Sequence, residues 1–93
     1  MAAIYNIHLH IPGCTLLKEK RLWLKPLIAH LHREFNISMA EMYLQDRWQE
    51  AIIACALVNN GRAQIRRSLQ LVSKWVAAYC PDGMVVEEML EMI

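Results

Sequence analysis

The sequence has no apolar run that approaches the length of a membrane-spanning helix, although 56% of its 93 residues are hydrophobic. Cysteine is also scarce: Cys14, Cys55 and Cys80 are odd in number, and none belongs to a CxxC pair. No signal-peptide pattern precedes the first predicted strand. We therefore expect one cytoplasmic domain with reduced thiols and no membrane contact. Part of the hydrophobic excess should lie at a subunit or partner contact.

Motifs of catalysis are missing as well. The chain contains no paired-acid motif, nucleophile elbow or glycine-rich phosphate loop, so we predict no catalytic residue, no cofactor and no enzymatic activity. His8 and His10 fall on one side of a predicted strand with Cys14 close behind, but no further ligand follows at a metal-site spacing, and we predict no metal. Two alternatives stay open: a Cys–His pair that would need an activated Cys14, and an enzyme for a small anion that would need a pocket.

The net charge of +1 hides an uneven distribution. Every Lys and Arg lies between Lys18 and Lys74, whereas four acidic residues crowd the last dozen positions. Residues 61–79 contain no acid and four bases, which are Arg62, Arg66, Arg67 and Lys74. A segment with this imbalance indicates an acidic partner.

The first half of the chain reads as a strand followed by a helix. Residues 4–11 alternate between apolar and polar, which predicts a half-buried strand that ends at Pro12-Gly13. Residues 17–35 repeat their apolar positions at helical spacing and predict an amphipathic helix. Pro26 lies opposite the apolar stripe, so we expect a gentle bend there; the alternative is a helix that begins only at Lys25-Pro26.

The second half predicts two strands, a helix and a last strand. Residues 37–44 and 51–58 read as strands joined by a short connection. Asn59 or Asn60 can cap a second helix, whose core stripe is expected to contain Ile65, Leu69, Val72, Val76 and Tyr79. Pro81-Asp82-Gly83 ends that helix, and residues 84–93 form the final strand. Its expected core positions are even-numbered, despite Glu88 at one such position: Met84, Val86, Leu90 and Met92.

The predicted order βαββαβ favours an α+β ferredoxin-like sandwich, a four-stranded antiparallel sheet with two helices on one face. In that topology the first and third strands are central. Asn6, His8 and His10 should then face away from the helices, beside three apolar residues of the third strand, Ile52, Ala54 and Ala56. Such an open face suits a partner or a dimer mate.

The chain resembles the YlxP-like family of small bacterial proteins, a family of unknown function. The shared segments are HIPG at 10–13, LKEKR at 17–21, Phe35-Asn36, Ser38, Ala40-Glu41, Gln45-Asp46, Trp48-Gln49 and Arg62-Ala63. The resemblance implies a ferredoxin-like fold and a cytoplasmic protein whose gene often lies among genes for translation initiation and ribosome maturation; it implies no activity. This chain departs from the family at Leu16, where a serine commonly completes a capping box with Glu19, and at Pro26. Thr15 can cap the helix instead.

The start of the first helix is a candidate anion site. Lys18, Lys20, Arg21 and Lys25 gather where the helix dipole already disfavours positive charge. A placement that local physics opposes is a better sign of function than a neutral one, so we predict contact with phosphate. The alternative is a solvated basic face. Arg62, Arg66, Arg67 and Lys74 would add a second strip, with Arg67 and Lys74 facing solvent and Arg62 and Arg66 flanking the core stripe.

Tryptophans complete the candidates. Trp48 could stack on a base, although a Trp in a hairpin more often packs onto its own core. Trp23, Trp75, Leu22 and Leu71 fall beside the helix stripes, and we expect them to pack the two helices together; the alternative is an exposed patch. Altogether we predict a non-enzymatic module that binds RNA or a ribosomal particle through basic helix residues. The alternative is a structural protein that forms a homodimer through its open sheet face or its C-terminal edge strand.

Overall fold

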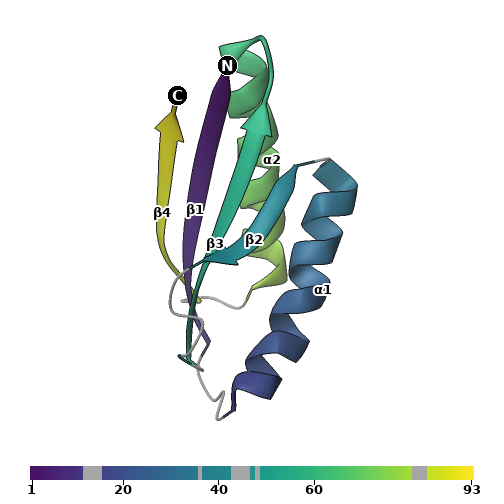
Figure 1. Ribbon diagram of the computed structural model, residues 1–93, viewed down its shortest axis with the longest axis vertical. Helices are drawn as coiled ribbons and strands as arrows, with labels where there is room; N and C mark the ends of the chain where they lie inside the picture. The colour runs from purple at the N-terminus through teal and green to yellow at the C-terminus, as the bar shows by residue number, and fades with distance from the viewer. Residues whose placement is uncertain (12–15, 36, 43–46, 48, 81–83) are drawn as a thin grey trace.

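The computed structural model describes residues 1–11, 16–35, 37–42, 47, 49–80 and 84–93 (Figure 1). The predicted turns at Pro12-Gly13 and Pro81-Asp82-Gly83 and the Thr15 cap lie outside these residues. The predicted order of elements and the α+β ferredoxin-like fold are confirmed. The elements are β1 (Ala2–His10), α1 (Leu17–Phe35), β2 (Ser38–Met42), β3 (Glu50–Val58), α2 (Arg62–Tyr79) and β4 (Val85–Met92).

The four strands form one antiparallel sheet in the order β2-β3-β1-β4, so β1 and β3 are central as predicted. Tyr5 of β1 lies opposite Cys55 of β3 on one side and Leu90 of β4 on the other. In Figure 1 helix α2 lies behind the sheet and α1 stands beside its β2 edge. Buried side chains of both helices pack into one core on the same face of the sheet. Successive side chains of a strand point to opposite faces, so this arrangement divides each strand between a covered and an open face.

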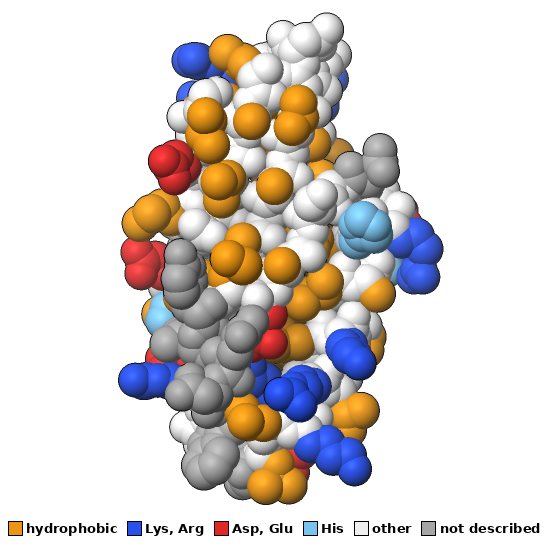
Figure 2. Space-filling view, viewed as in Figure 1, with side chains coloured by type: hydrophobic (Ala, Val, Ile, Leu, Met, Phe, Trp, Pro, Cys, Tyr) orange, Lys and Arg blue, Asp and Glu red, His pale blue; other side chains and the backbone are white. Residues whose placement is uncertain are grey.

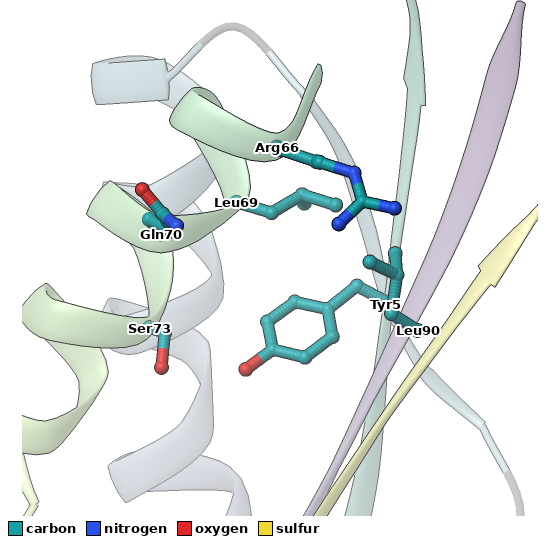
Figure 3. A pocket seen from close by; sticks show the side chains of 6 residues that line it. All are labelled: Tyr5, Arg66, Leu69, Gln70, Ser73 and Leu90. Carbon is teal, nitrogen blue, oxygen red and sulfur yellow. The ribbon is translucent and has the colours of Figure 1, made fainter. Parts of the chain in front are cut away.

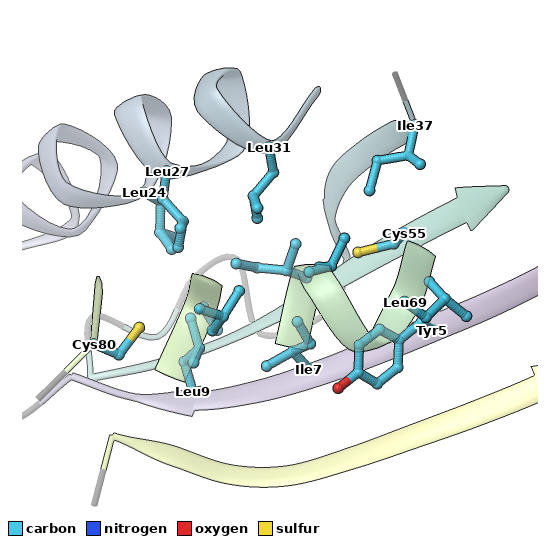
Figure 4. Close-up of a cluster of buried hydrophobic side chains, with 14 of the residues drawn as sticks. Tyr5, Ile7, Leu9, Leu24, Leu27, Leu31, Ile37, Cys55, Leu69 and Cys80 are labelled. Carbon is cyan, nitrogen blue, oxygen red and sulfur yellow. The ribbon is translucent and has the colours of Figure 1, made fainter. Parts of the chain in front are cut away.

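The core forms where the helices meet the covered face (Figure 4). Tyr5, Ile7 and Leu9 of β1 are buried, whereas their even-numbered neighbours are half-buried on the open face. Cys55 of β3 is fully buried, and burial raises the pKa of its thiol to about 12. Burial also raises the pKa of Cys80, and both residues are free thiols.

Helix α1 continues through Pro26, so a helix that begins only at Lys25-Pro26 is the wrong alternative. Pro26 is exposed and donates no hydrogen bond to the carbonyl of Leu22. Leu22 is itself 66% exposed, so water can satisfy that carbonyl. The buried stripe of α1, Leu24, Leu27 and Leu31, is uninterrupted.

The N-cap of helix α2 lies one residue after Asn60 and two after Asn59, the two predicted caps. Gly61 occupies the N-cap position and supplies no side-chain cap, so the expected capping by Asn59 or Asn60 is wrong. The side-chain oxygen of Asn59 instead accepts a hydrogen bond of 2.9 Å from the Gly61 N–H. Four predicted stripe residues are buried: Ile65, Leu69, Val72 and Val76. Tyr79 is 40% exposed and lies outside the core, contrary to prediction.

Aromatic side chains pack the two helices against each other. His30 of α1 stacks on Trp75 of α2 with ring centroids 4.1 Å apart, and Trp75 stacks on Tyr79 at 5.0 Å. Trp23 of α1 contacts Tyr79 at 5.5 Å. Helix packing by Trp23 and Trp75 is thus confirmed, whereas Leu22 and Leu71 are exposed.

The prediction that even-numbered residues of the last strand lie in the core is only partly right. The register shifts between His8, which pairs with Glu87, and Leu9, which pairs with Val85. This irregularity inserts Val86 as an extra residue, and Val86 is 57% exposed. The other predicted core residues differ among themselves: Met84 is buried, Met92 is partly buried, and Leu90 lies opposite Tyr5 but is 42% exposed.

Lys20 is a charged residue that is buried in the protein. Its side chain is 1% exposed, its Nζ lies 2.7 Å from Glu41 Oε2 of β2, and it donates a hydrogen bond of 2.7 Å to the Arg47 carbonyl. The pair therefore connects the start of α1 to β2 and to the chain between β2 and β3.

Replacing Lys20 should destabilise the fold without removing an exposed charge. We expect Lys20→Met to lower the free energy of unfolding by about 3 kcal/mol, because the partly buried carboxylate of Glu41 would lose the ammonium 2.7 Å away. Adding Glu41→Gln should recover part of that loss. Urea unfolding measures both, with Lys18→Met at an exposed position as the control. Equal midpoints for Lys20→Met and Lys18→Met would contradict this role.

Candidate functional site

Positive charge is concentrated in the helix layer. Nine of the ten Lys and Arg residues belong to α1 or α2, whereas only two of the nine acids, Glu19 and Glu34, do so. The four strands contain no Lys or Arg at all. The charges of the two layers therefore differ in sign, as the sequence distribution indicated.

The predicted cluster on α1 separates into exposed and buried members. Lys18, Arg21 and Lys25 are exposed, and their spacing of three and four residues places them on one face of the helix. Lys20 turns inward to Glu41. The structure therefore corrects the assignment of Lys20 to the anion-binding set, because its ammonium is already paired inside the protein.

The predicted strip on α2 also divides. Arg67 and Lys74 line a surface groove of about 340 Å³ together with Gln70, Leu71 and Ser73. Arg62 is exposed in the first turn, which contains no acidic residue. Arg66 instead extends over Leu69 toward β1 and β4 (Figure 3). We call the exposed bases of the two helices other than Arg66 the basic helix layer: Lys18, Arg21, Lys25, Arg33, Arg62, Arg67 and Lys74.

A pocket of about 230 Å³ lies where Arg66 reaches the sheet. We call it the Tyr5 pocket; its lining residues are Tyr5, Arg66, Leu69, Gln70, Ser73 and Leu90 (Figure 3). The hydroxyl of Tyr5 points to the end near Ser73, where it donates a hydrogen bond to Glu88 Oε1. The Ser73 hydroxyl donates to the same oxygen at 2.9 Å. Burial, together with the hydrogen bond to Glu88, raises the pKa of Tyr5 to about 12.

Sequence reasoning missed this pocket, although one signal was present. Glu88 interrupts the apolar even-numbered positions of β4, and it does lie opposite the buried Ile7 on the covered side. A carboxylate at such a position needs hydrogen-bond donors. Tyr5 and Ser73 provide them, which explains why an acid is tolerated beside the core.

The open face of the sheet carries apolar side chains interspersed with polar and acidic ones, as Figure 2 shows from the front. Asn6 and His8 lie there opposite Ala54 and Ile52, and His10 shares that face, which confirms the predicted orientation. His8 Nε2 is 3.4 Å from Glu50 Oε1. Further members of this face come from β2 and β4: Ser38, Ala40, Met42, Glu87, Met89 and Glu91.

The remaining candidate site residues either gain little support from the structure or lie outside the described residues. Trp48 and Cys14 are outside the described residues. Arg47 is exposed and lies 3.4 Å from Glu50. Among the residues that the structure describes, no three His, Cys, Asp or Glu side chains gather as metal ligands would. No helix within the described ranges is long and apolar enough to cross a membrane.

Comparison with known proteins decides the family. The model of a family described as "Protein of unknown function (DUF503)" matches residues 2–89. The chain belongs to the DUF503 family. A relative from Bacillus subtilis (strain 168) is described as "Uncharacterized protein YlxP". It is 35% identical over 63 residues, which cover 68% of each chain. The expected YlxP-like family is thereby confirmed.

A solved structure agrees with this DUF503 fold. The cofactor-independent oxygenase SnoaB from Streptomyces nogalater, in its N63A mutant, superposes with a TM-score of 0.59 at 11% identity, covering 99% of this chain and 92% of its own. The de novo designed protein Ferredog-Diesel gives a TM-score of 0.48 at 12% identity, covering 99% and 85%. At these identities the likeness to SnoaB shows the fold alone.

The hydrogen bond from Tyr5 to Glu88 predicts a pH-dependent stability difference. Tyr5→Phe should cost about 2 kcal/mol at neutral pH, because a hydrogen bond to a charged acceptor is lost. The ordinary tyrosine pKa of 10.0 applies to the unfolded chain, and that of folded Tyr5 is about 12. Between these two pH values Tyr5 loses its proton in the unfolded wild-type protein but keeps it in the folded one. The free energy of unfolding of the wild type therefore falls as pH rises, whereas the Phe variant lacks this loss.

Urea unfolding from about pH 8 to about pH 11 tests this dependence. The advantage of the wild type should be constant up to about pH 9.5 and shrink above it. Parallel stability curves for the two proteins would contradict the assignment of the raised pKa to Tyr5.

Proposed function

We propose that this protein is a non-enzymatic, cytoplasmic module that binds RNA, free or within a ribosomal particle, through phosphate contacts of the basic helix layer. The observation that carries the proposal is the charge placement: the helices hold nine of ten bases and two of nine acids. Phosphate neutralisation by Lys and Arg supplies most of the sequence-independent affinity for nucleic acids.

The geometry of the exposed bases supports a joint interaction with an extended anion. Lys18 and Lys25 are seven residues apart on one face of α1, as are Arg67 and Lys74 on α2, which is roughly 10 Å along each helix axis. The Debye length at physiological ionic strength is about 8 Å. Arg21 lies within about 6 Å along the axis of both Lys18 and Lys25, so the three bases of α1 act together. The absence of acids from α2 leaves its row uncompensated within the helix.

The helix layer also favours contacts with the RNA backbone over sequence-specific contacts with the bases. Its aromatic side chains, Trp23, Trp75 and Tyr79, are engaged with one another and with His30 between the helices. They are therefore not arranged as the stacking platform that sequence-specific readers of single strands use. The expected interaction is tolerant of sequence and sensitive to salt.

Neutralising one row should weaken RNA binding and flatten its salt dependence. We expect the triple variant Lys18→Gln, Arg21→Gln and Lys25→Gln to bind a single-stranded RNA oligonucleotide at least about tenfold more weakly at low salt. The slope of log affinity against log salt should fall by about 2, because each lost phosphate contact contributes about 0.7. Fluorescence anisotropy across a salt series measures both.

The control variant changes charge on the other side of the molecule. Glu87→Gln with Glu91→Gln alters exposed acids on the open face and should change the affinity by less than about twofold. An RNA affinity that is unchanged in the triple variant would contradict the proposal, and so would an affinity of the wild type that does not depend on salt.

A second candidate function is homodimerisation through the open face. The observation in its favour is the row of apolar residues Ile52, Ala54 and Ala56 along β3 on this face, in a sheet whose strands contain no Lys or Arg, since charged residues are depleted at interface centres. Four strands of up to nine residues give a face of roughly 500–600 Å² in projection, near the low end for a specific interface. A second copy would bring the same flat face against it.

Sedimentation tests this second candidate. If the face pairs two copies, Ile52→Glu should convert dimer to monomer, because it places a charge at the centre of the apolar face. Leu71→Glu, at an exposed leucine of α2, serves as the matched control and should leave the mass unchanged. A wild-type protein that remains monomeric at about 100 μM would exclude this mode.

A further inference from the structure

Groups of opposite charge lie in and beside the Tyr5 pocket. Arg66 reaches over one end (Figure 3). The lining hydroxyls of Tyr5 and Ser73 lie at the other end and both donate to Glu88, which lies next to the lining. We propose that this pocket binds a small zwitterion, a molecule with a carboxylate at one end, an amine at the other and an apolar body between them. This inference stands apart from the basic helix layer and does not depend on RNA binding.

Arg66 is the anchor for the carboxylate. Within the described part of the chain its guanidinium makes no ion pair or hydrogen bond, although it extends across the pocket above Leu69 and Tyr5. A guanidinium offers paired N–H donors in a planar fork that matches both oxygens of a carboxylate. The neighbouring Arg67 lines a different groove, so the pocket selects one of two adjacent arginines.

Glu88 is the anchor for the amine. Tyr5 and Ser73 both donate to its Oε1, which fixes the carboxylate in place. Among described residues nothing is hydrogen-bonded to Oε2, so that oxygen can accept an ammonium group. A plain anion is disfavoured here, because the negative charge of Glu88 is held beside the pocket by two of its lining residues, Tyr5 and Ser73.

The walls between these ends are apolar and set the size of the ligand. The ring of Tyr5 and the side chains of Leu69 and Leu90 line the middle of the pocket. Arg66 and Ser73 are seven residues apart on α2, about 10 Å along the axis. A volume of about 230 Å³ is below the range of about 300–1,000 Å³ for drug-sized ligands. One ring or a short chain between the charged groups therefore fits.

Three small probes separate the contributions of the two ends. The zwitterion is para-aminomethylbenzoate, benzoate has only the carboxylate, and benzylamine has only the amine. Titration of the isotope-labelled chain by NMR should shift the backbone signals of Leu69, Gln70, Ser73 and Leu90. We expect millimolar affinity for the zwitterion, as suits a ligand of this size, and at least about tenfold weaker binding of either single-ended probe.

Paired variants identify the anchors. Arg66→Gln should weaken the zwitterion by at least about fivefold and leave benzylamine unchanged, while Glu88→Gln should weaken the zwitterion similarly and leave benzoate no weaker. Arg67→Gln and Glu87→Gln make the same charge changes one residue away, outside the pocket, and should have no effect. The amide spectra report whether each variant remains folded.

Several outcomes would overturn the inference. Benzoate that binds as tightly as the zwitterion would remove the role of Glu88 and indicate a simple anion site. Equal losses in Arg66→Gln and Arg67→Gln would indicate diffuse attraction to the basic helix layer. The absence of shifts at the pocket with any probe up to about 10 mM would show that the pocket holds no such ligand.

Discussion

A sheet covered on one face only is the constraint from which the other features follow. Both helices pack on the same side, so each strand must bury alternate residues and present the rest to solvent or a partner. Tyr5, Ile7 and Leu9 meet the helices, whereas Asn6 and His8 lie on the open face. Lys and Arg are confined almost entirely to the helices, whose outer surfaces face water. The separation of charge between the layers is thus a consequence of the fold.

Features that depend on local periodicity could be predicted from the sequence. The alternation in β1 and the stripes of α1 and α2 each belong to a single element, so neighbouring residues suffice to reveal the buried side. The order of elements and the handedness of their connections then leave the ferredoxin-like sheet order as the simplest closure. Pro26 was compatible with this pattern because it lies on the exposed side, where a missing hydrogen bond is tolerated.

Features that depend on distant residues could not be predicted in this way. Lys20 looked like its basic neighbours, and its burial requires a carboxylate at Glu41 and a carbonyl at Arg47, contributed by other segments. The extra residue Val86 in β4 is visible only in the pairing of that strand with β1. Arg66 was expected to flank the core stripe, but its place in a pocket depends on the edge strand that supplies Leu90 and Glu88.

The same constraint explains why three surfaces of different character coexist on a small domain. The outer helix surface is basic, the open face is part apolar and part polar, and the Tyr5 pocket lies at the seam where α2 meets β1 and β4. At that seam Arg66 of α2 lines the pocket, and Glu88 of β4 accepts hydrogen bonds from two of the lining residues. A ligand that satisfies both charges avoids the repulsion that either a pure anion or a pure cation would meet. Selectivity for a zwitterion therefore arises from the junction of two oppositely charged layers, and neither layer alone would provide it.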